Sequence, residues 1–125
     1  MAIARSRQAT RYRVAAARPR DLSLLPAIEL AASRLFDGYG LDDVPFQPTG
    51  QDGLRQAQHD GRLWVVLTHE APVGFALVEV IEPGSAHLEE LDVHPDHGRR
   101  GLGTRLLTHD APFVVAWTIV AGARP

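Results

Sequence analysis

β-Branched and apolar residues dominate three neighbouring segments in the middle of the chain, which is typical of β-strands. We predict strands over residues 62–69, 73–82 and 86–95. Only Glu-Ala-Pro and Pro-Gly-Ser separate these segments, and connections this short join antiparallel neighbours. The pattern therefore predicts a meander of three antiparallel strands.

The segments before this meander alternate between strand and helix patterns. Residues 11–19 predict a first strand, which ends at a proline. Apolar residues then recur at helical spacing, which predicts a helix that is N-capped by Asp21 and ends at Gly38. Residues 37–50 are rich in Gly, Pro and Asp and predict a loop, and residues 51–61 predict a short polar helix.

The length and composition restrict the classes of protein that need considering. A chain of 125 residues suits one domain, and the absence of cysteine excludes disulfides and thiolate metal sites. The histidines lack metal-binding spacing, so we predict no metal. No apolar run is long enough to span a membrane and no signal peptide is recognisable, so we predict a cytoplasmic protein. Abundant alanine, and arginine without lysine, favour a GC-rich bacterial source.

Charge is distributed unevenly along the chain. The formal net charge is −2, yet six of the arginines and no acid lie in residues 1–20. We interpret residues 1–10 as a basic, disordered leader, in preference to a transit segment or a nucleic-acid-binding arm. Tyr12 is the only aromatic residue in this region, so we predict no nucleic-acid partner. The acidic remainder favours a cationic substrate.

The sequence VHPDHGRRGLGTRLL, residues 93–107, follows the third strand of the meander. Leucines at helical spacing predict that a helix begins near Gly101. The first amides of a helix lack internal partners and its N-terminus is partly positive, so anions bind there. Gly101 and Gly103 leave room for a phosphate, and Arg99 and Arg100 would add charged hydrogen bonds. This chemistry points to a phosphorylated ligand.

Other phosphate-binding patterns do not fit this segment. The dinucleotide fingerprint needs three glycines at a different spacing, and a chain without lysine cannot form a Walker motif. A Gly-x-Gly pair alone is equally compatible with a tight strand-to-helix turn that carries two surface arginines. The spacing by itself leaves both interpretations open.

Residues 91–107 resemble the coenzyme A motif of the GNAT N-acetyltransferase superfamily. That motif is a strand ending in Val-x-Pro, followed by Gln/Arg-x-x-Gly-x-Gly/Ala at the start of a helix. The matching residues are Val93, Pro95, Gly101, Leu102 and Gly103. The order of strand, two helices and three antiparallel strands is also similar to the family, and the resemblance covers about residues 11–107.

The resemblance implies a single domain over residues 11–125, with a mixed α+β fold. It would contain a central mixed, largely antiparallel sheet flanked by helices, and lack the C-terminal part of the fold. It also implies that acetyl-CoA is the co-substrate. The implied coenzyme A site has two parts. The backbone at the end of the third strand would bind the pantetheine arm, and the amides of the following loop would bind the pyrophosphate. The residues of this site are Leu91, Asp92, Val93, Gly98, Arg99, Arg100, Gly101, Leu102, Gly103 and Thr104.

The chain departs from the family pattern at two places. Gly98 stands where the family usually has Gln or Arg. Neither tyrosine of the chain matches the family tyrosine that often protonates the leaving thiolate. The tail, residues 108–125, contains an apolar segment over 113–120 that predicts a buried strand. The alternative is that the tail is not native to the fold, as after a truncation or frameshift.

A general base is expected because an ammonium acceptor must lose a proton before it attacks. The period of two along a strand places His87, Glu89, Leu91 and Val93 on one face, with Glu90 on the other unless a β-bulge intervenes. The resemblance implies a base near His87, because some members of the family carry a general-base glutamate four residues before the position of Leu91, and Glu89 lies one step closer to the reaction centre. We therefore select Glu89 and His87 as catalytic candidates. The alternative is that His87, Glu89 and Glu90 are ordinary solvated strand residues and that a water relay replaces a side-chain base.

The resemblance implies that the chain is an N-acetyltransferase that transfers an acetyl group from acetyl-CoA to an amine. The acceptor would be a small molecule, a protein N-terminus or a lysine. The alternative is a truncated, weakly active or inactive member that binds coenzyme A or serves as an interaction module. Because the sheet would be incomplete, we also expect self-association.

Overall fold

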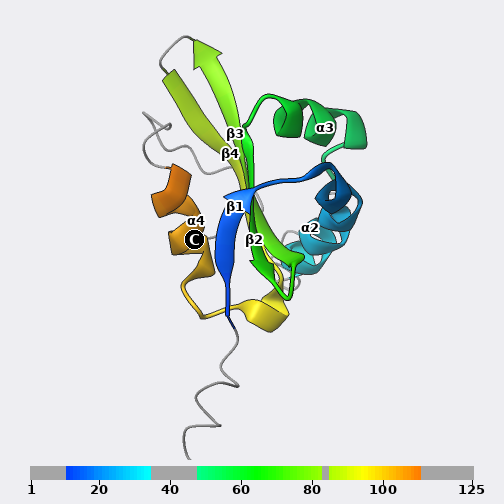
Figure 1. Ribbon diagram of the computed structural model, residues 1–125, viewed down its shortest axis with the longest axis vertical. Helices are drawn as coiled ribbons and strands as arrows, with labels where there is room; N and C mark the ends of the chain where they lie inside the picture. The colour runs from blue at the N-terminus through cyan, green and yellow to red at the C-terminus, as the bar shows by residue number, and fades with distance from the viewer. Residues whose placement is uncertain (1–10, 35–47, 83–84, 111–125) are drawn as a thin grey trace, which may run out of the picture.

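The computed structural model describes residues 11–34, 48–82 and 85–110. The predicted leader, the strand over 113–120 and most of the loop over 37–50 lie outside these residues. Within the described part, helices cover both faces of a twisted sheet (Figure 1). No helix among the described residues is long and apolar enough to cross a membrane.

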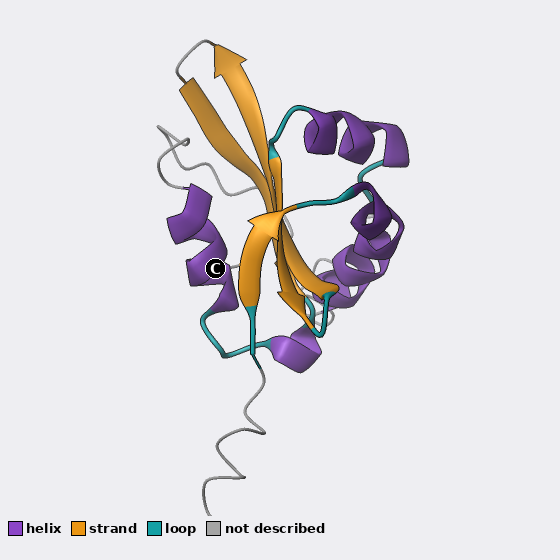
Figure 2. Ribbon diagram, in the orientation of Figure 1, coloured by secondary structure: helices purple, strands orange, loops and turns teal. Residues whose placement is uncertain are grey.

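Four antiparallel strands form the sheet in the order β1-β2-β3-β4 (Figure 2). The strands are β1 (Arg13–Ala16), β2 (Leu63–Thr68), β3 (Ala71–Glu82) and β4 (Ser85–Val93). The short β2–β3 and β3–β4 connections produce the predicted meander, and β1 adds to its β2 edge. The predicted mixed α+β fold with a largely antiparallel sheet flanked by helices is confirmed.

The helical segments match the predicted order, with one correction at the first of them. They are η1 (Pro19–Leu24), α2 (Leu25–Ser33), α3 (Gln51–His59), η3 (Pro95–His97) and α4 (Leu102–Asp110), where η denotes a 3₁₀ helix. The prediction that Asp21 caps an α-helix is wrong. Asp21 lies within η1, and its buried carboxylate accepts hydrogen bonds of 2.8 Å from the backbone N–H of Arg18 and 3.0 Å from Nε of Arg18. Arg18 thus holds this carboxylate in the 3₁₀ turn that precedes α2.

Two apolar layers hold the helices on the sheet. η1, α2 and α3 pack on one face, where Leu25 and Leu54 are fully buried against Phe75 of β3. α4 packs on the other face, where Leu106 is fully buried against Leu91 of β4. Truncating a buried leucine to alanine typically costs about 2–5 kcal/mol, so each layer contributes substantially to stability.

A β-bulge in β4 changes which side chains face each layer. Leu77 pairs with Glu90 and Val78 pairs with Leu88, so Glu89 is the extra residue between them. Leu88 and Leu91 consequently both join the layer under α4. The expectation that Glu89 and Leu91 share one face is wrong, because the bulge interrupts the period of two.

β4 is the last strand of the described sheet. Within the described residues only β3 pairs with it, so its other edge can present N–H and C=O groups to an additional chain or ligand. Self-association through this edge stays a prediction, which light scattering on the eluting protein would test.

Candidate functional site

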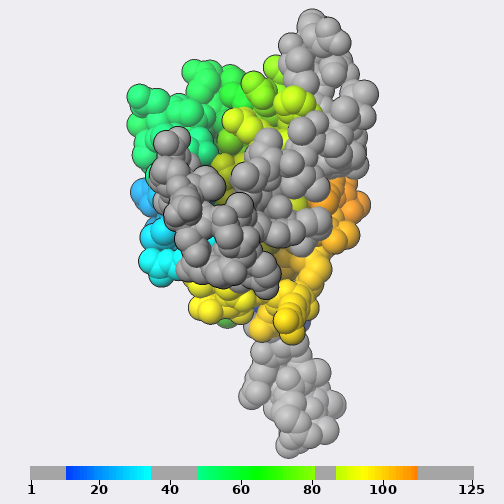
Figure 3. Space-filling model, turned by 180° about the vertical axis from the view of Figure 1, so that it is seen from behind, coloured from blue at the N-terminus to red at the C-terminus, as the bar shows by residue number. Residues whose placement is uncertain are grey.

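The glycine loop connects β4 to α4 at one end of the sheet. The backbone turns through η3, and then Arg99 and Gly101 adopt positive φ angles of 60° and 72°. Glycine adopts such an angle without the steric cost that other residues meet, and a Cβ added at Gly101 would meet no atom within 4 Å. The backbone at Gly101 is therefore open to a ligand, and this segment lies at the molecular surface (Figure 3).

The first turn of α4 supplies the donors that the sequence predicted. Arg105 N–H donates to Gly101 O at 3.0 Å, so the preceding amides of Leu102, Gly103 and Thr104 lie in the turn that has no intrahelical acceptors. Leu102 is buried and anchors the helix to the sheet, whereas Thr104 is exposed. This geometry fits a phosphate group at the helix N-terminus.

The start of the described chain supports the glycine loop. Tyr12 Oη lies 2.8 Å from His97 Nδ1, and the guanidinium carbon of Arg100 lies 6.0 Å from the centre of the Tyr12 ring. Arg105 also donates a 3.0 Å hydrogen bond to Tyr12 O. Burial, and then the charges of Arg100 and His94, lower the pKa of His97. A neutral His97 leaves Arg99 and Arg100, both exposed, as the cations of the loop.

The edge of β4 that pairs with no other described strand runs toward this loop. His94 N–H donates to Val73 O at 2.8 Å, which directs the amide of His94 toward β3. Because amides alternate in direction along a strand, those of Leu91 and Val93 are directed away from β3. The predicted pantetheine-binding positions therefore lie on the outer edge of the described sheet. The side chain of Asp92 is buried and points toward the face that α2 covers.

Three carboxyl groups meet under α2, beside the bulge. Oxygens of Glu29, Glu90 and Asp92 all lie within 4.8 Å of one another. Thr49 joins two of them: its Oγ1 lies 2.8 Å from Glu90 Oε1, and its backbone N–H donates to Glu29 Oε2 at 3.1 Å. A spacing this close also occurs in cation sites, and the expectation of no metal stays a prediction.

Burial of these carboxyl groups disfavours their charged forms. Burial, together with the neighbouring carboxyl groups, raises the pKa of Glu29 and of Glu90 to about 8 and that of Asp92 to about 6. The cluster thus retains protons at neutral pH. Shared protons allow the carboxyl groups to hydrogen-bond to each other instead of repelling.

We expect stability to fall as pH rises from about 4.5 toward 8. The unfolded chain releases these glutamate protons near its ordinary pKa of 4.5, whereas the folded chain keeps them until about 8. The folded state therefore binds more protons in this window, and the slope approaches about 1.4 kcal/mol per pH unit for each retained proton. Urea unfolding across the window measures this slope. Glu29→Gln should make the slope shallower, and an equal slope in this variant would contradict the assignment.

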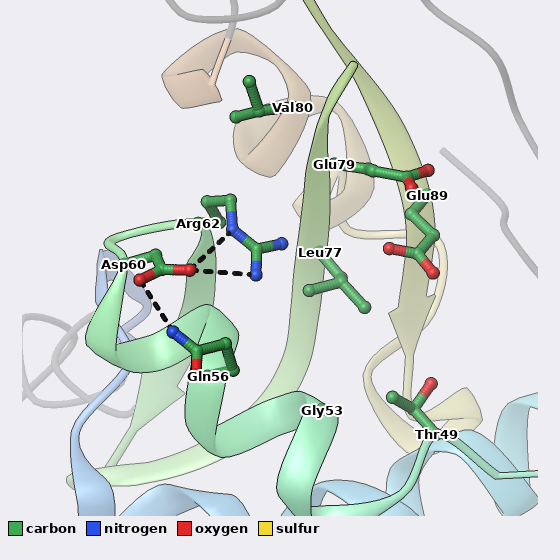
Figure 4. Close-up of a pocket in the computed structure, with 9 residues that line it drawn as sticks. All are labelled: Thr49, Gly53, Gln56, Asp60, Arg62, Leu77, Glu79, Val80 and Glu89. Carbon is green, nitrogen blue, oxygen red and sulfur yellow. Dashed lines mark hydrogen bonds and ion pairs between the residues drawn. The ribbon is translucent and has the colours of Figure 1, made fainter. Parts of the chain in front are cut away.

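A cavity of about 660 Å³ opens on the α3 side of the β3–β4 hairpin (Figure 4). Its wall contains both charged side chains and residues that are polar but uncharged or apolar. The lining residues are Thr49, Gly53, Gln56, Asp60, Arg62, Leu77, Glu79, Val80 and Glu89. Three carboxylates and one guanidinium give this wall an acidic character, and a pocket of this size accommodates a small molecule.

The two predicted catalytic residues lie in different surroundings. Glu89 is half-buried, lines the cavity and has no hydrogen-bond partner among the described residues. His87 lies opposite Glu79 in the sheet, and its Nε2 is 3.2 Å from Glu79 Oε2. Glu89 is thus the better placed of the two to meet a ligand in the cavity.

Sequence reasoning did not identify the carboxyl cluster. Glu29 looked like a helix residue, Thr49 a loop residue and Glu90 a solvated strand residue. Glu90 and Asp92 alternate with Leu91 and so face α2, but their approach to Glu29 depends on how α2 packs on the sheet, which has no local sequence signature. The polar residue Glu29 among apolar neighbours in α2 was the one available signal.

Comparisons with known proteins agree with this architecture. The profile of the acetyltransferase (GNAT) family matches residues 28–111. No curated protein sequence matches the chain.

Solved structures resemble the chain at low sequence identity. The PaiA N-acetyltransferase from Thermoplasma acidophilum, in complex with coenzyme A, is 13% identical with a TM-score of 0.65, over 82% of this chain and 70% of that one. N-acetylglutamate synthase from Neisseria gonorrhoeae, with coenzyme A and N-acetyl-glutamate, is 17% identical with a TM-score of 0.61, over 82% and 22%. The ribosomal-protein-S18-alanine N-acetyltransferase from Escherichia coli is 23% identical with a TM-score of 0.57, over 79% and 56%.

These likenesses concern the fold, and the chain spans only 22% of the synthase and 56% of the S18-alanine N-acetyltransferase. The family match covers more than half of the 125 residues and includes the glycine loop and the first turns of α4. The chain belongs to the GNAT family of acetyltransferases.

Proposed function

We propose that the protein is an N-acetyltransferase that transfers the acetyl group of acetyl-CoA to an amine. The observation that carries this proposal is the glycine loop between β4 and α4, where an open backbone at Gly101 adjoins the helix N-terminus. Family membership adds weight, and two of the similar structures hold coenzyme A.

The loop would bind the pyrophosphate of acetyl-CoA. The amides from Arg99 to Thr104 would donate hydrogen bonds, and the exposed arginines, Arg99 and Arg100, would add charge-assisted ones. Gly98 has no side chain to contribute here, and a Cβ at this position would lie 3.2 Å from Pro95 O. Gly98 is therefore suited to a close turn, and the charge comes from its neighbours.

The strand edge would bind the pantetheine arm. The outward amides of Leu91 and Val93 offer donors to an extended ligand, in the way that an added strand pairs with a sheet edge. Asp92 would contribute only its backbone, because its side chain is buried toward α2. This arrangement brings the thioester end of the ligand toward the bulge.

Glu89 would act as the base, with His87 as the second candidate. Glu89 accepts a proton from the acceptor ammonium, and the free amine attacks the thioester carbonyl carbon. The C–S bond breaks as the C–N bond forms; the second proton, which nitrogen loses after attack, goes to the departing thiolate, and Glu89 later releases the first proton to solvent. Glu90 is a poorer base at neutral pH because burial raises its pKa to about 8, so it already holds a proton.

Thermal unfolding with ligands tests the binding half of this proposal. We expect coenzyme A to raise the melting temperature, because it binds the folded state only. Adenosine diphosphate should reproduce part of the shift, because it carries the pyrophosphate that the loop would hold. Identical melting curves with and without millimolar coenzyme A would contradict the proposed site.

A further inference from the structure

The cavity between α3 and the β3–β4 hairpin has an uneven charge distribution. Among the described residues that line the cavity, Arg62 is the one cation, and its guanidinium is already bound to other groups of the protein. Its guanidinium lies 3.3 Å from Asp60 Oδ2 and donates a 2.8 Å hydrogen bond to Val78 O. Asp60 and Arg62 therefore neutralise each other, as Figure 4 shows, and the remaining charge comes from glutamates.

The two glutamates lie on neighbouring strands across the cavity wall. Glu79 pairs with His87 in the register, so Glu89 stands diagonal to Glu79 across the hairpin. Leu77 provides apolar surface in the wall beside them. The cavity thus offers two carboxylates from neighbouring strands, with the largely buried Leu77 in the same wall.

The two carboxylates differ in the hydrogen bonds that they already make. The side chain of Glu89 has no hydrogen-bond partner among the described residues. In Glu79 only one carboxylate oxygen, Oε2, has a partner, which is His87 Nε2. Oε1 of Glu79 thus keeps its acceptor capacity for a ligand. A half-buried carboxylate that accepts no hydrogen bond from the described residues destabilises the folded state unless a cation or a water molecule binds to it.

We propose that this cavity binds the acceptor, and that the acceptor is a small aliphatic diamine. One amino group reacts beside Glu89, and the second, as an ammonium, pairs with Glu79 while the alkyl spacer contacts Leu77. This inference rests on the proposed acetyl transfer, and it narrows the substrate class. A peptide amine is disfavoured because a second cation at fixed spacing would not generally accompany it.

Acetylation rates for matched amines test the proposal. 1,5-Diaminopentane should exceed 1-aminopentane in kcat/KM by about tenfold, and 5-aminopentanoate should be poorer than both. Glu79→Gln should lower the preference for the diamine about three- to fivefold, as expected for a partly exposed ion pair. The loss should appear in KM for the diamine, and it should exceed any change for 1-aminopentane, which has no second ammonium to pair with Glu79.

Asp52→Asn is the matched control, because it removes one carboxylate of α3 outside the cavity, whose side chain is 96% exposed. It should leave the diamine preference intact. Equal kcat/KM for the diamine and the monoamine in the wild-type protein would overturn the proposal. An equal loss for both amines in Glu79→Gln would overturn it as well.

Direct binding separates this proposal from the proposed function. Calorimetric titration of the wild-type chain with 1,5-diaminopentane needs no acetyl transfer. Binding that weakens in Glu79→Gln but not in Asp52→Asn supports the diamine site even if acetyl-CoA is never turned over. Absence of binding to a chain that does acetylate other amines would overturn the diamine site and leave the transferase standing.

Discussion

Replacing Gly101 with aspartate is expected to weaken coenzyme A binding by about 100-fold. Gly101 has a φ of 72° and open space around its missing Cβ, and Asp tolerates this conformation better than most residues do. The new carboxylate would lie where the phosphate approaches, and facing like charges cost several kcal/mol. Calorimetric titration with coenzyme A measures the loss.

Gly101→Asn is the control for this variant, since it has the same size and the same tolerance of positive φ without the charge. We expect Asn to weaken binding less than Asp does, and both variants to melt at similar temperatures. Wild-type affinity in Gly101→Asp would mean that the phosphates bind elsewhere. Gly103 is unsuited to this test because it is buried in the first turn of α4, where a large side chain would also disturb packing.

Removing the carboxylate of the proposed base, Glu89, should also have a large effect, in this case on kcat. Glu89→Gln is expected to lower kcat by about 100-fold, at the low end of what a positioned proton acceptor contributes. Coenzyme A affinity should not change, because Glu89 lies in the wall of the cavity on the α3 side. Steady-state kinetics together with coenzyme A titration separates these quantities.

Glu90→Gln provides the comparison. Glutamine resembles the protonated carboxyl group that burial imposes on Glu90 at neutral pH, so we expect kcat to change much less than in Glu89→Gln. The opposite order, with Glu90→Gln inactive and Glu89→Gln active, would assign the base to the buried cluster. His87→Gln should be mild, since the imidazole contacts Glu79.

The arrangement of strands and helices was largely predictable from the sequence. The short Glu-Ala-Pro and Pro-Gly-Ser connections allow only antiparallel neighbours, and β2, β3 and β4 follow them. The glycine loop was predictable too, because strand, Gly-x-Gly and an amphipathic helix follow one another directly. Such local patterns involve residues that are close in sequence, where geometry is restricted.

The contacts of the buried carboxyl groups on the α2 side of the sheet were not predictable in the same way. Asp21 has the residue type of an N-cap, but pairing with Arg18 holds it inside a 3₁₀ turn. Glu29, Thr49 and Glu90 come together only through the packing of α2 on a bulged strand. Non-local packing decides the contacts of Glu29, Thr49 and Glu90, and neither propensity nor periodicity encodes it.

Acetyl-dependent release of coenzyme A tests the central claim most directly. The chain contains no cysteine, so a thiol reagent added to the full chain with acetyl-CoA detects only released coenzyme A. We predict slow release without an acceptor, and a saturable increase when an aliphatic amine is added. The increase should disappear in Gly101→Asp. Binding of acetyl-CoA with no amine-dependent release, for any amine tested, would contradict acetyl transfer and make the protein a coenzyme A-binding module.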